Sequence, residues 1–187
     1  MTLRNTSERY GSVQVTLHWM MLLLLIAVYA CIELKDFFPK GSDVRVALKT
    51  WHFMLGLTVL VLATVRLAVH LLGPSPRIRP SPAHWQVLAG KIMHTGLYLF
   101  MIGMPILGWL ILSSDEKVVP FFGFQLPALT GANPGLSEQL EEIHETVGTI
   151  GYVLIGLHAA AALVHHYFLR DDTLRRILPQ RRAPTLR

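Results

Sequence analysis

The sequence contains little cysteine and little charge. Its single cysteine, Cys31, lies inside an apolar run. One thiol cannot form a disulfide within the chain, and it argues against a zinc or iron–sulfur centre built on cysteines. Only 16% of the residues are charged, whereas 52% are hydrophobic and the mean hydropathy is +0.43. Such a composition is typical of a membrane protein rather than of a soluble domain.

The chain also lacks internal repeats, low-complexity tracts and the alternating pattern of a β-barrel. In their place are four apolar stretches, at about residues 13–34, 46–72, 85–112 and 140–169. About 20 helical residues cross the roughly 30 Å of hydrocarbon in a bilayer, and backbone groups in lipid must form hydrogen bonds within their own segment. The sequence therefore predicts an all-α membrane protein, a bundle of four transmembrane helices over residues 13–169.

Three connections join the predicted helices. The first, KDFFPKGSD, is short. The second, GPSPRIRPSP, carries four prolines in ten residues, so we expect it to be extended and non-helical. The third covers residues 113–139, and its aromatic residues and prolines favour a loop that lies along the membrane surface rather than a fifth span.

The basic residues predict the orientation of this bundle. The net charge of +5 could indicate nucleic acid, but these residues lie at the ends of apolar segments, so nucleic acid is not an expected partner. The excess of Lys and Arg marks the cytoplasmic side, which gives a cytoplasmic N-terminus over 1–12 and a basic cytoplasmic tail over 170–187 that contacts lipid headgroups. Twelve Lys and Arg residues lie in the termini, the second connection and the adjoining helix ends, and five lie in the first and third connections with their helix ends. The twelve are Arg4, Arg9, Arg66, Arg77, Arg79, Lys91, Arg170, Arg175, Arg176, Arg181, Arg182 and Arg187. The five are Lys35, Lys40, Arg45, Lys49 and Lys117.

Histidines recur inside the apolar stretches at matching depths. His144 and His158 are fourteen residues apart, which is about 21 Å along one helix and within about 40° of the same face. Near the outer surface the possible partner of His144 is His52. Deeper in the membrane, His158 matches the depth of His18, but His94 matches it too, so spacing leaves two candidates for the inner pair.

Paired imidazoles on facing helices are typical of a six-coordinate haem iron, which takes one histidine from each side of a flat macrocycle. A zinc site would need three or four ligands at one level, and a di-metal carboxylate bundle would need a second Glu-x-x-His motif beside Glu141–His144. A proton relay is the other reason to place histidines in lipid, and a lone histidine is often only a hydrogen-bonded core residue. Two depth-matched pairs favour haem.

Small and charged residues near these histidines agree with a macrocycle. Arg66 follows His52 by fourteen residues, so it shares that face about 21 Å deeper, at the inner level. An arginine there needs an anion, and a haem propionate would provide one, although the side chain could instead extend to the cytoplasmic headgroups. Four glycines lie near the histidines: Gly56, Gly148, Gly151 and Gly156. Glycine lets the backbone approach a porphyrin closely, although these residues could instead serve only to pack helices together.

Several motifs together make the chain similar to a known family. The longest is IHETVGTIGYVLIGLHAAAALVHHYF, and the shorter ones are TLHWMM, WHFMLG, DFFP and VRLAVHLLGPSP. With these motifs the chain resembles the bacterial cytochrome b561 family over nearly its whole length, from Tyr10 to Pro179.

The resemblance implies a membrane bundle that encloses two b-type haems. His18 and His158 would be the axial ligands of the inner haem, and His52 and His144 those of the outer haem. This assignment leaves His94 without a role as an axial ligand. It also implies a multi-pass protein of the bacterial inner membrane.

The resemblance extends to a ubiquinone-reducing member of the family that takes electrons from superoxide at the periplasmic face and passes them through both haems. Cations at the outer end could attract superoxide there; they are Lys35, Arg45, Lys49 and Lys117. His165, two turns after His158 on the same face, is the first candidate to contact ubiquinone or relay protons, and His94 is the second. No obligate protein partner is expected for this reaction. The rival function is a membrane anchor cytochrome that links a partner dehydrogenase or hydrogenase to the quinone pool.

Overall fold

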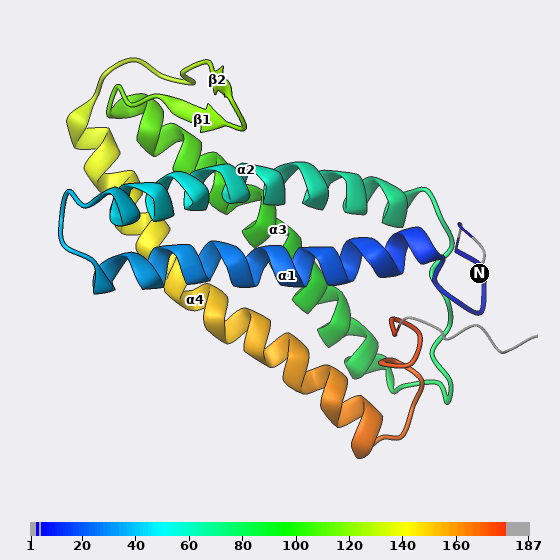
Figure 1. The fold of residues 1–187 in the computed structure, drawn as a ribbon. Helices are drawn as coiled ribbons and strands as arrows, with labels where there is room; N and C mark the ends of the chain where they lie inside the picture. The colour runs from blue at the N-terminus through cyan, green and yellow to red at the C-terminus, as the bar shows by residue number, and fades with distance from the viewer. Residues whose placement is uncertain (1–2, 4, 179–187) are drawn as a thin grey trace, which may run out of the picture.

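The computed structural model describes residue 3 and residues 5–178, and helices dominate it (Figure 1). Helices α1 and α2 are joined by a short 3-10 turn, η1, and α3 and α4 are joined by a β-hairpin (Figure 1). In the described part of the chain the elements are α1 Ser12–Leu34, η1 Lys35–Phe37, α2 Asp43–Leu71, α3 His84–Ser114, β1 Val119–Phe121, β2 Phe124–Leu126 and α4 Pro134–Tyr167. We call the end of the bundle with η1 and the hairpin the outer end, and the opposite end the inner end.

All four helices are long and apolar enough to cross a membrane, and among the described residues no other helix is. The prediction of four spans is therefore confirmed, and most predicted boundaries lie within three residues of the observed ones. The start of the last helix was wrong, because α4 begins at Pro134 rather than near residue 140. Asn133 caps it by accepting a hydrogen bond from the N–H of Leu136 (3.0 Å), so the helix extends past its apolar part.

The helices pack in chain order, and α4 stands apart from α1 and α2. In Figure 1, α1 and α2 lie side by side, and α3 and α4 cross behind them. Helix α1 packs on α2, α2 on α3, and α3 on α4, but across these described helices no Cα atom of α1 or α2 lies within 8 Å of one of α4. Side chains, not backbone contacts, must therefore span the gap beside α4.

One such bridge lies toward the outer end of the bundle. The hydroxyl of Tyr29 on α1 donates to the carbonyl of Gly148 on α4 (2.7 Å), and the ring of Tyr29 packs on that of Tyr152 at 4.3 Å between centroids. Gly151 makes room for this packing, because a Cβ atom there would meet the Tyr29 hydroxyl and lie 2.7 Å from Cε2 of Phe100. The site tolerates only glycine without rearrangement of these rings.

The third connection differs from the predicted loop, because it contains a two-stranded antiparallel hairpin that pairs Val119 with Leu126 and Phe121 with Phe124. The turn residues Phe122 and Gly123 both have positive φ, 45° and 88°, as a two-residue hairpin turn requires. The buried side chain of Val119 packs in a small core at the outer ends of α2 and α3. No fifth span forms in this segment.

At the inner end, residues 171–178 fold back across the bundle; we call this segment the inner strap. The N–H of Asp172 donates to the carbonyl of Arg79 (3.0 Å), and Nη1 of Arg176 donates to the carbonyl of Pro76 (2.5 Å). The indole of Trp19 on α1 donates to the carbonyl of Ile177 (2.8 Å). The strap thus joins α4, the proline-rich second connection and α1. Parts of the predicted cytoplasmic segments lie outside the described residues, namely 1–2, 4 and 179–187, with the basic residues Arg4, Arg181, Arg182 and Arg187.

Candidate functional site

Two histidines face each other across the gap near the outer end. His52 lies on α2 and His144 on α4, and their ring centroids are 6.2 Å apart. Nδ1 of His52 donates to the carbonyl of Val28 on α1 (3.0 Å), since a carbonyl can only accept. The proton of neutral His52 is therefore on Nδ1, and Nε2 keeps the free lone pair that a metal needs. Nδ1 of His144 is buried without a hydrogen-bond partner in the described residues.

A second pair lies at the inner level. His18 on α1 and His158 on α4 have ring centroids 6.3 Å apart, and His94 on α3 lies 5.4 Å from His158. The structure therefore brings together both candidates that the sequence left open for the inner pair.

The spacing of the rings separates these candidates. An imidazole nitrogen lies about 1 Å from its ring centre and about 2 Å from a coordinated metal, so two rings on opposite sides of one metal have centres about 6 Å apart. The pairs His52–His144 and His18–His158 both have this separation. His94 and His158 are closer than it allows.

A cavity of about 620 Å³ surrounds the outer pair. Gly56, Gly108 and Gly148 line it beside His52 and His144. A Cβ atom at Gly56 would meet nothing within 4 Å, and one at Gly108 would lie 3.5 Å from Cε1 of His144. The volume lies within the range of small-molecule and cofactor sites, and the open space beside Gly56 leaves room for a flat group next to the histidines.

Arg66 lies at the inner level, as predicted, but its contact there is with a histidine. Its Nη2 donates to Nδ1 of His18 (3.1 Å), and its guanidinium lies 5.8 Å from the centre of the Tyr98 ring. Nε of Arg66 is buried without a partner among the described residues. The contact with His18 places the proton of the neutral imidazole on Nε2, the opposite tautomer to that of His52.

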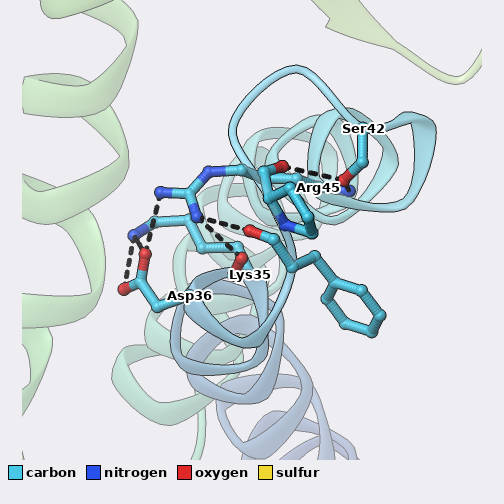
Figure 2. Close-up of polar contacts among 6 residues, drawn as sticks. Lys35, Asp36, Ser42 and Arg45 are labelled. Carbon is cyan, nitrogen blue, oxygen red and sulfur yellow. Dashed lines mark hydrogen bonds and ion pairs between the residues drawn. The ribbon is translucent and has the colours of Figure 1, made fainter.

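The cations predicted at the outer end all line the outer cavity, but most are paired with carboxylates. Figure 2 shows the carboxylate of Asp36 in contact with the side-chain nitrogens of both Lys35 and Arg45. The oxygen–nitrogen distance is 2.8 Å to each. The guanidinium of Arg45 also donates to the carbonyls of Lys35 and Phe38, both at 3.0 Å. These contacts tie the first connection together, and they neutralise much of its positive charge.

The other two cations differ from each other. Lys117 forms an ion pair with Asp115, whereas Lys49 has no ion-pair or hydrogen-bond partner in the part of the chain that the structure describes. The cavity lining carries four cations and five carboxylates, so its net charge is not positive; the carboxylates are Glu33, Asp36, Asp115, Glu141 and Glu145. Of the predicted four, Lys49 is the most available to an anion.

His165, the first candidate for quinone contact, already has a partner. Its Nδ1 lies 2.5 Å from Oδ2 of Asp171, a residue that is only 6% exposed. Burial raises the pKa of the Asp171 carboxyl, but hydrogen bonds from His165 and from Thr173 outweigh it, so the pKa lies below its usual value. His94, the second candidate, lies next to His158 rather than beside Asp171.

Sequence reasoning missed two groups of residues. Asp171 reaches His165 because the backbone reverses at Arg170, which adopts a positive φ of 54°. At the outer cavity, the hydroxyl of Tyr152 donates to the carboxylate of Glu33 (2.7 Å). No simple pattern in the sequence marks either contact. Among the described residues, no cluster of three or more His, Cys, Asp or Glu side chains is placed to hold a metal ion.

A membrane-spanning helical bundle with two histidine pairs at two heights beside one helix is typical of membrane-bound haem cytochromes. Residues 9–180 match the family described as prokaryotic cytochrome b561, and the chain belongs to this family. It is therefore a multi-pass bacterial membrane protein of electron transfer, from a family whose members bind b-type haem. The family resemblance drawn from the motifs is confirmed.

Relatives match almost end to end. The chain is 37% identical over 175 residues to "Cytochrome b561 homolog 1" of Escherichia coli (strain K12), covering 94% of this chain and 99% of that protein. It is also 37% identical over 176 residues to "Probable superoxide oxidase CybB" of Yersinia pestis, with the same coverage. "Cytochrome b561 homolog 2" of Escherichia coli (strain K12) is 27% identical over 186 residues, covering 95% of each chain.

Proposed function

We propose that this protein oxidises superoxide to dioxygen at the outer end of the bundle and passes the electrons through two haems b to ubiquinone. Two superoxide anions give up one electron each, and ubiquinone takes both electrons and two protons to form ubiquinol. In this proposal both termini lie in the cytoplasm and the hairpin lies in the periplasm of the inner membrane.

The observation that carries the proposal is that two histidine pairs lie across the gap beside α4. Their ring centroids are 6.2 and 6.3 Å apart. Haem b held at each level would supply a one-electron carrier there. His52 is poised to bind iron through Nε2, because Val28 takes the proton on Nδ1. His18 is not yet in that tautomer, so iron ligation requires Arg66 to turn away from Nδ1. A haem propionate is the anion that would hold Arg66 in its new position.

At the outer end, Lys49 is the residue best placed to attract superoxide, because the other predicted cations are already paired. The reaction makes and breaks no carbon bonds, so we expect no nucleophile. The residues here bind, orient and admit the donor. The Yersinia pestis relative named as a probable superoxide oxidase supports this choice of donor.

The test is a reduction assay on the purified protein with no partner protein. We expect a superoxide source to reduce the haems, as followed by their absorbance spectrum. Superoxide dismutase should abolish this reduction, and added ubiquinone should reoxidise the haems. Lys49→Gln should slow the superoxide step several-fold, and more at low than at high salt because the attraction is electrostatic. Lys117→Gln is the matched control and should change the rate less, since Lys117 is already paired with Asp115. No reduction by superoxide would refute the proposed donor.

The rival function is that of an anchor cytochrome for a partner dehydrogenase or hydrogenase. It is favoured by the balanced charge of the outer cavity, whose five carboxylates do not attract an anion. A partner protein with a basic surface would suit such a lining better than superoxide would. Haem reduction that occurs only when a partner enzyme and its substrate are added would favour this function over the first.

A further inference from the structure

We propose that His165 and Asp171 form a proton-delivering pair that serves ubiquinone reduction at the inner end of the bundle. This inference rests on the proposed function for its acceptor. It adds Asp171, a residue outside the membrane-spanning helices, as the positioning residue of the pair, and His165 as the proton donor.

The contact between the two side chains is short and enclosed. Nδ1 of His165 lies 2.5 Å from Oδ2 of Asp171, and the carboxylate side chain is only 4% exposed. The other carboxylate oxygen, Oδ1, accepts the backbone N–H of Thr173 (2.9 Å), and the N–H of Asp171 donates to the carbonyl of His165 (3.1 Å). Both ends of the carboxylate are therefore fixed, and the ring of His165 is fixed with them.

This arrangement sets the state of the imidazole. The low pKa of Asp171 keeps its carboxyl ionised near neutral pH, and an ionised carboxylate can only accept, so Nδ1 of His165 carries a proton. Nε2 has no hydrogen-bond partner in the described residues, so it is the ring nitrogen free to take up a proton and pass it to an acceptor.

The pair lies where an acceptor at the inner level would meet it. His165 follows His158 by seven residues, so it lies about 10 Å further inward and within about 20° of the same face of α4. That face carries the imidazoles that cross the gap beside α4. The side chain of His165 is 20% exposed, so it is enclosed without being sealed.

The proton balance of the reaction calls for such a group. Each ubiquinone needs two electrons and two protons, and electrons from superoxide bring no protons with them. In each transfer the Nε2–H bond of protonated His165 breaks and an O–H bond forms on the ubiquinone oxygen. A proton taken up from the aqueous phase at the inner end then restores the Nε2–H bond of His165, while the Nδ1–H stays hydrogen-bonded to Asp171. Two such cycles complete one ubiquinol.

The neighbouring carboxylate provides a contrast, because Asp172 also lies in the inner strap but, among the described residues, forms no hydrogen bond or ion pair with a histidine. Its Oδ1 accepts the N–H of Arg79 (2.9 Å), and it forms an ion pair with Arg176 (3.4 Å). A role confined to holding the strap would belong to both carboxylates. A role in proton transfer belongs to Asp171 alone.

The experiment measures reoxidation of the chemically reduced haems by two acceptors. Ubiquinone-1 takes up protons with its electrons, whereas ferricyanide takes up electrons only. We expect His165→Gln and Asp171→Asn to slow reoxidation by ubiquinone-1 about tenfold or more, the low end of general acid–base effects, and to leave the ferricyanide rate and the haem spectrum unchanged. Asp171→Glu should restore part of the rate, and Asp172→Asn, the control, should leave both rates unchanged.

Each outcome bears on one claim. Three results would overturn the proton-delivering pair and leave the proposed function standing. The first is that the variants slow reoxidation equally with both acceptors, and the second is that Asp171→Asn and Asp172→Asn slow it equally. The third is that neither His165→Gln nor Asp171→Asn changes the rate with ubiquinone-1. Failure of ubiquinone-1 to reoxidise the wild-type protein would refute the proposed acceptor, and the pair with it. Because reduction is chemical, neither result depends on superoxide as the donor.

Discussion

At the scale of single residues, the histidines of the bundle differ by what each ring nitrogen contacts. His52 and His165 both donate from Nδ1, to a carbonyl and to a carboxylate, whereas Nδ1 of His18 accepts from Arg66. A buried imidazole is costly unless its nitrogens are satisfied, and Nδ1 of His144 has no partner in the described chain. These contacts distinguish histidines of similar chemistry, and the roles proposed for them, iron ligation for His52 and proton transfer for His165, follow the contacts of each ring.

The two histidine pairs should hold their haems independently. His144→Ala or His52→Ala removes one ligand of the outer pair, and the inner pair about 21 Å away keeps both of its ligands. We expect the purified variant to retain roughly half of the haem absorbance of the wild type, because one of two sites remains. Loss of all pigment from a variant that still folds would contradict independent pairs.

Gly151 should be intolerant of any side chain. A Cβ atom at this position overlaps the Tyr29 hydroxyl and the Phe100 ring, so Gly151→Ala should destabilise the protein by about 1–3 kcal/mol, as overpacking does. Gly103→Ala is the control, because a Cβ there meets nothing within 4 Å, and it should leave stability unchanged or slightly raised. Thermal unfolding of both variants in detergent, followed by circular dichroism, measures the difference; equal stabilities would mean that the rings move aside freely.

At the scale of elements, α4 organises the site. It carries one member of each histidine pair, Gly151 and His165, on a single helix of 34 residues. In the described structure α4 packs against α3, and it meets α1 and α2 through side chains across the gap. Rotation of α4 about its axis would therefore displace both levels at once.

The inner strap should loosen in acid. The pKa of Asp171 is lower in the folded chain than in an unfolded one, so the contact with His165 stabilises the strap fully above about pH 4 and is lost as the pH falls through the folded pKa. Hydrogen exchange of residues 171–178, corrected for intrinsic rates, should show constant protection from neutral pH down to about 5 and less protection below about 4. Protection of the buried core residues Leu97 and Met101 is the reference. Constant strap protection across this range would contradict the ionic contact.

Elements differed in how well the sequence predicted them. Hydropathy found the four spans, since lipid demands long apolar helices, but it missed the start of α4, because its first turns extend beyond the apolar stretch and depend on the Asn133 cap. The sequence did not predict the hairpin, because its strands have three residues each and the first residue of its turn is Phe122 rather than asparagine or glycine. Fixed helical spacing predicted that His52 meets His144 and left His18 and His94 as candidates for His158, and the structure places both of these beside it. The contacts of Arg66 and Asp171 depend on side-chain orientation and a backbone reversal that spacing does not encode.

At the scale of the whole molecule, the bundle divides into an outer and an inner end with different chemistry. The outer end has a cavity lined by mixed charges around one histidine pair, and the inner end has the strap and the His165–Asp171 contact. Many large apolar side chains lie exposed on the helices between them, Leu99 (70%) among them, as expected for surfaces that face lipid. The proposed path for electrons therefore runs across the bilayer, from one end to the other.

The proposed orientation of the bundle rests on the distribution of basic residues and can be checked directly. We expect a fluorescent reporter fused after the C-terminus to be active, because it stays in the cytoplasm. Alkaline phosphatase inserted between Phe122 and Gly123, at the hairpin turn, should be active because that turn lies in the periplasm. If alkaline phosphatase were active when fused after the C-terminus and inactive when inserted at the hairpin, the bundle would have the opposite orientation.

The central claim is that two histidine pairs bind two haems in one chain. The most direct measurement is the haem-to-protein ratio of the purified wild-type protein, produced with ample haem supply, from the pyridine haemochromogen absorbance and quantitative amino-acid analysis. The account predicts two haems b per chain, both low-spin with histidine on each side of the iron. A protein that binds one haem or none would contradict it.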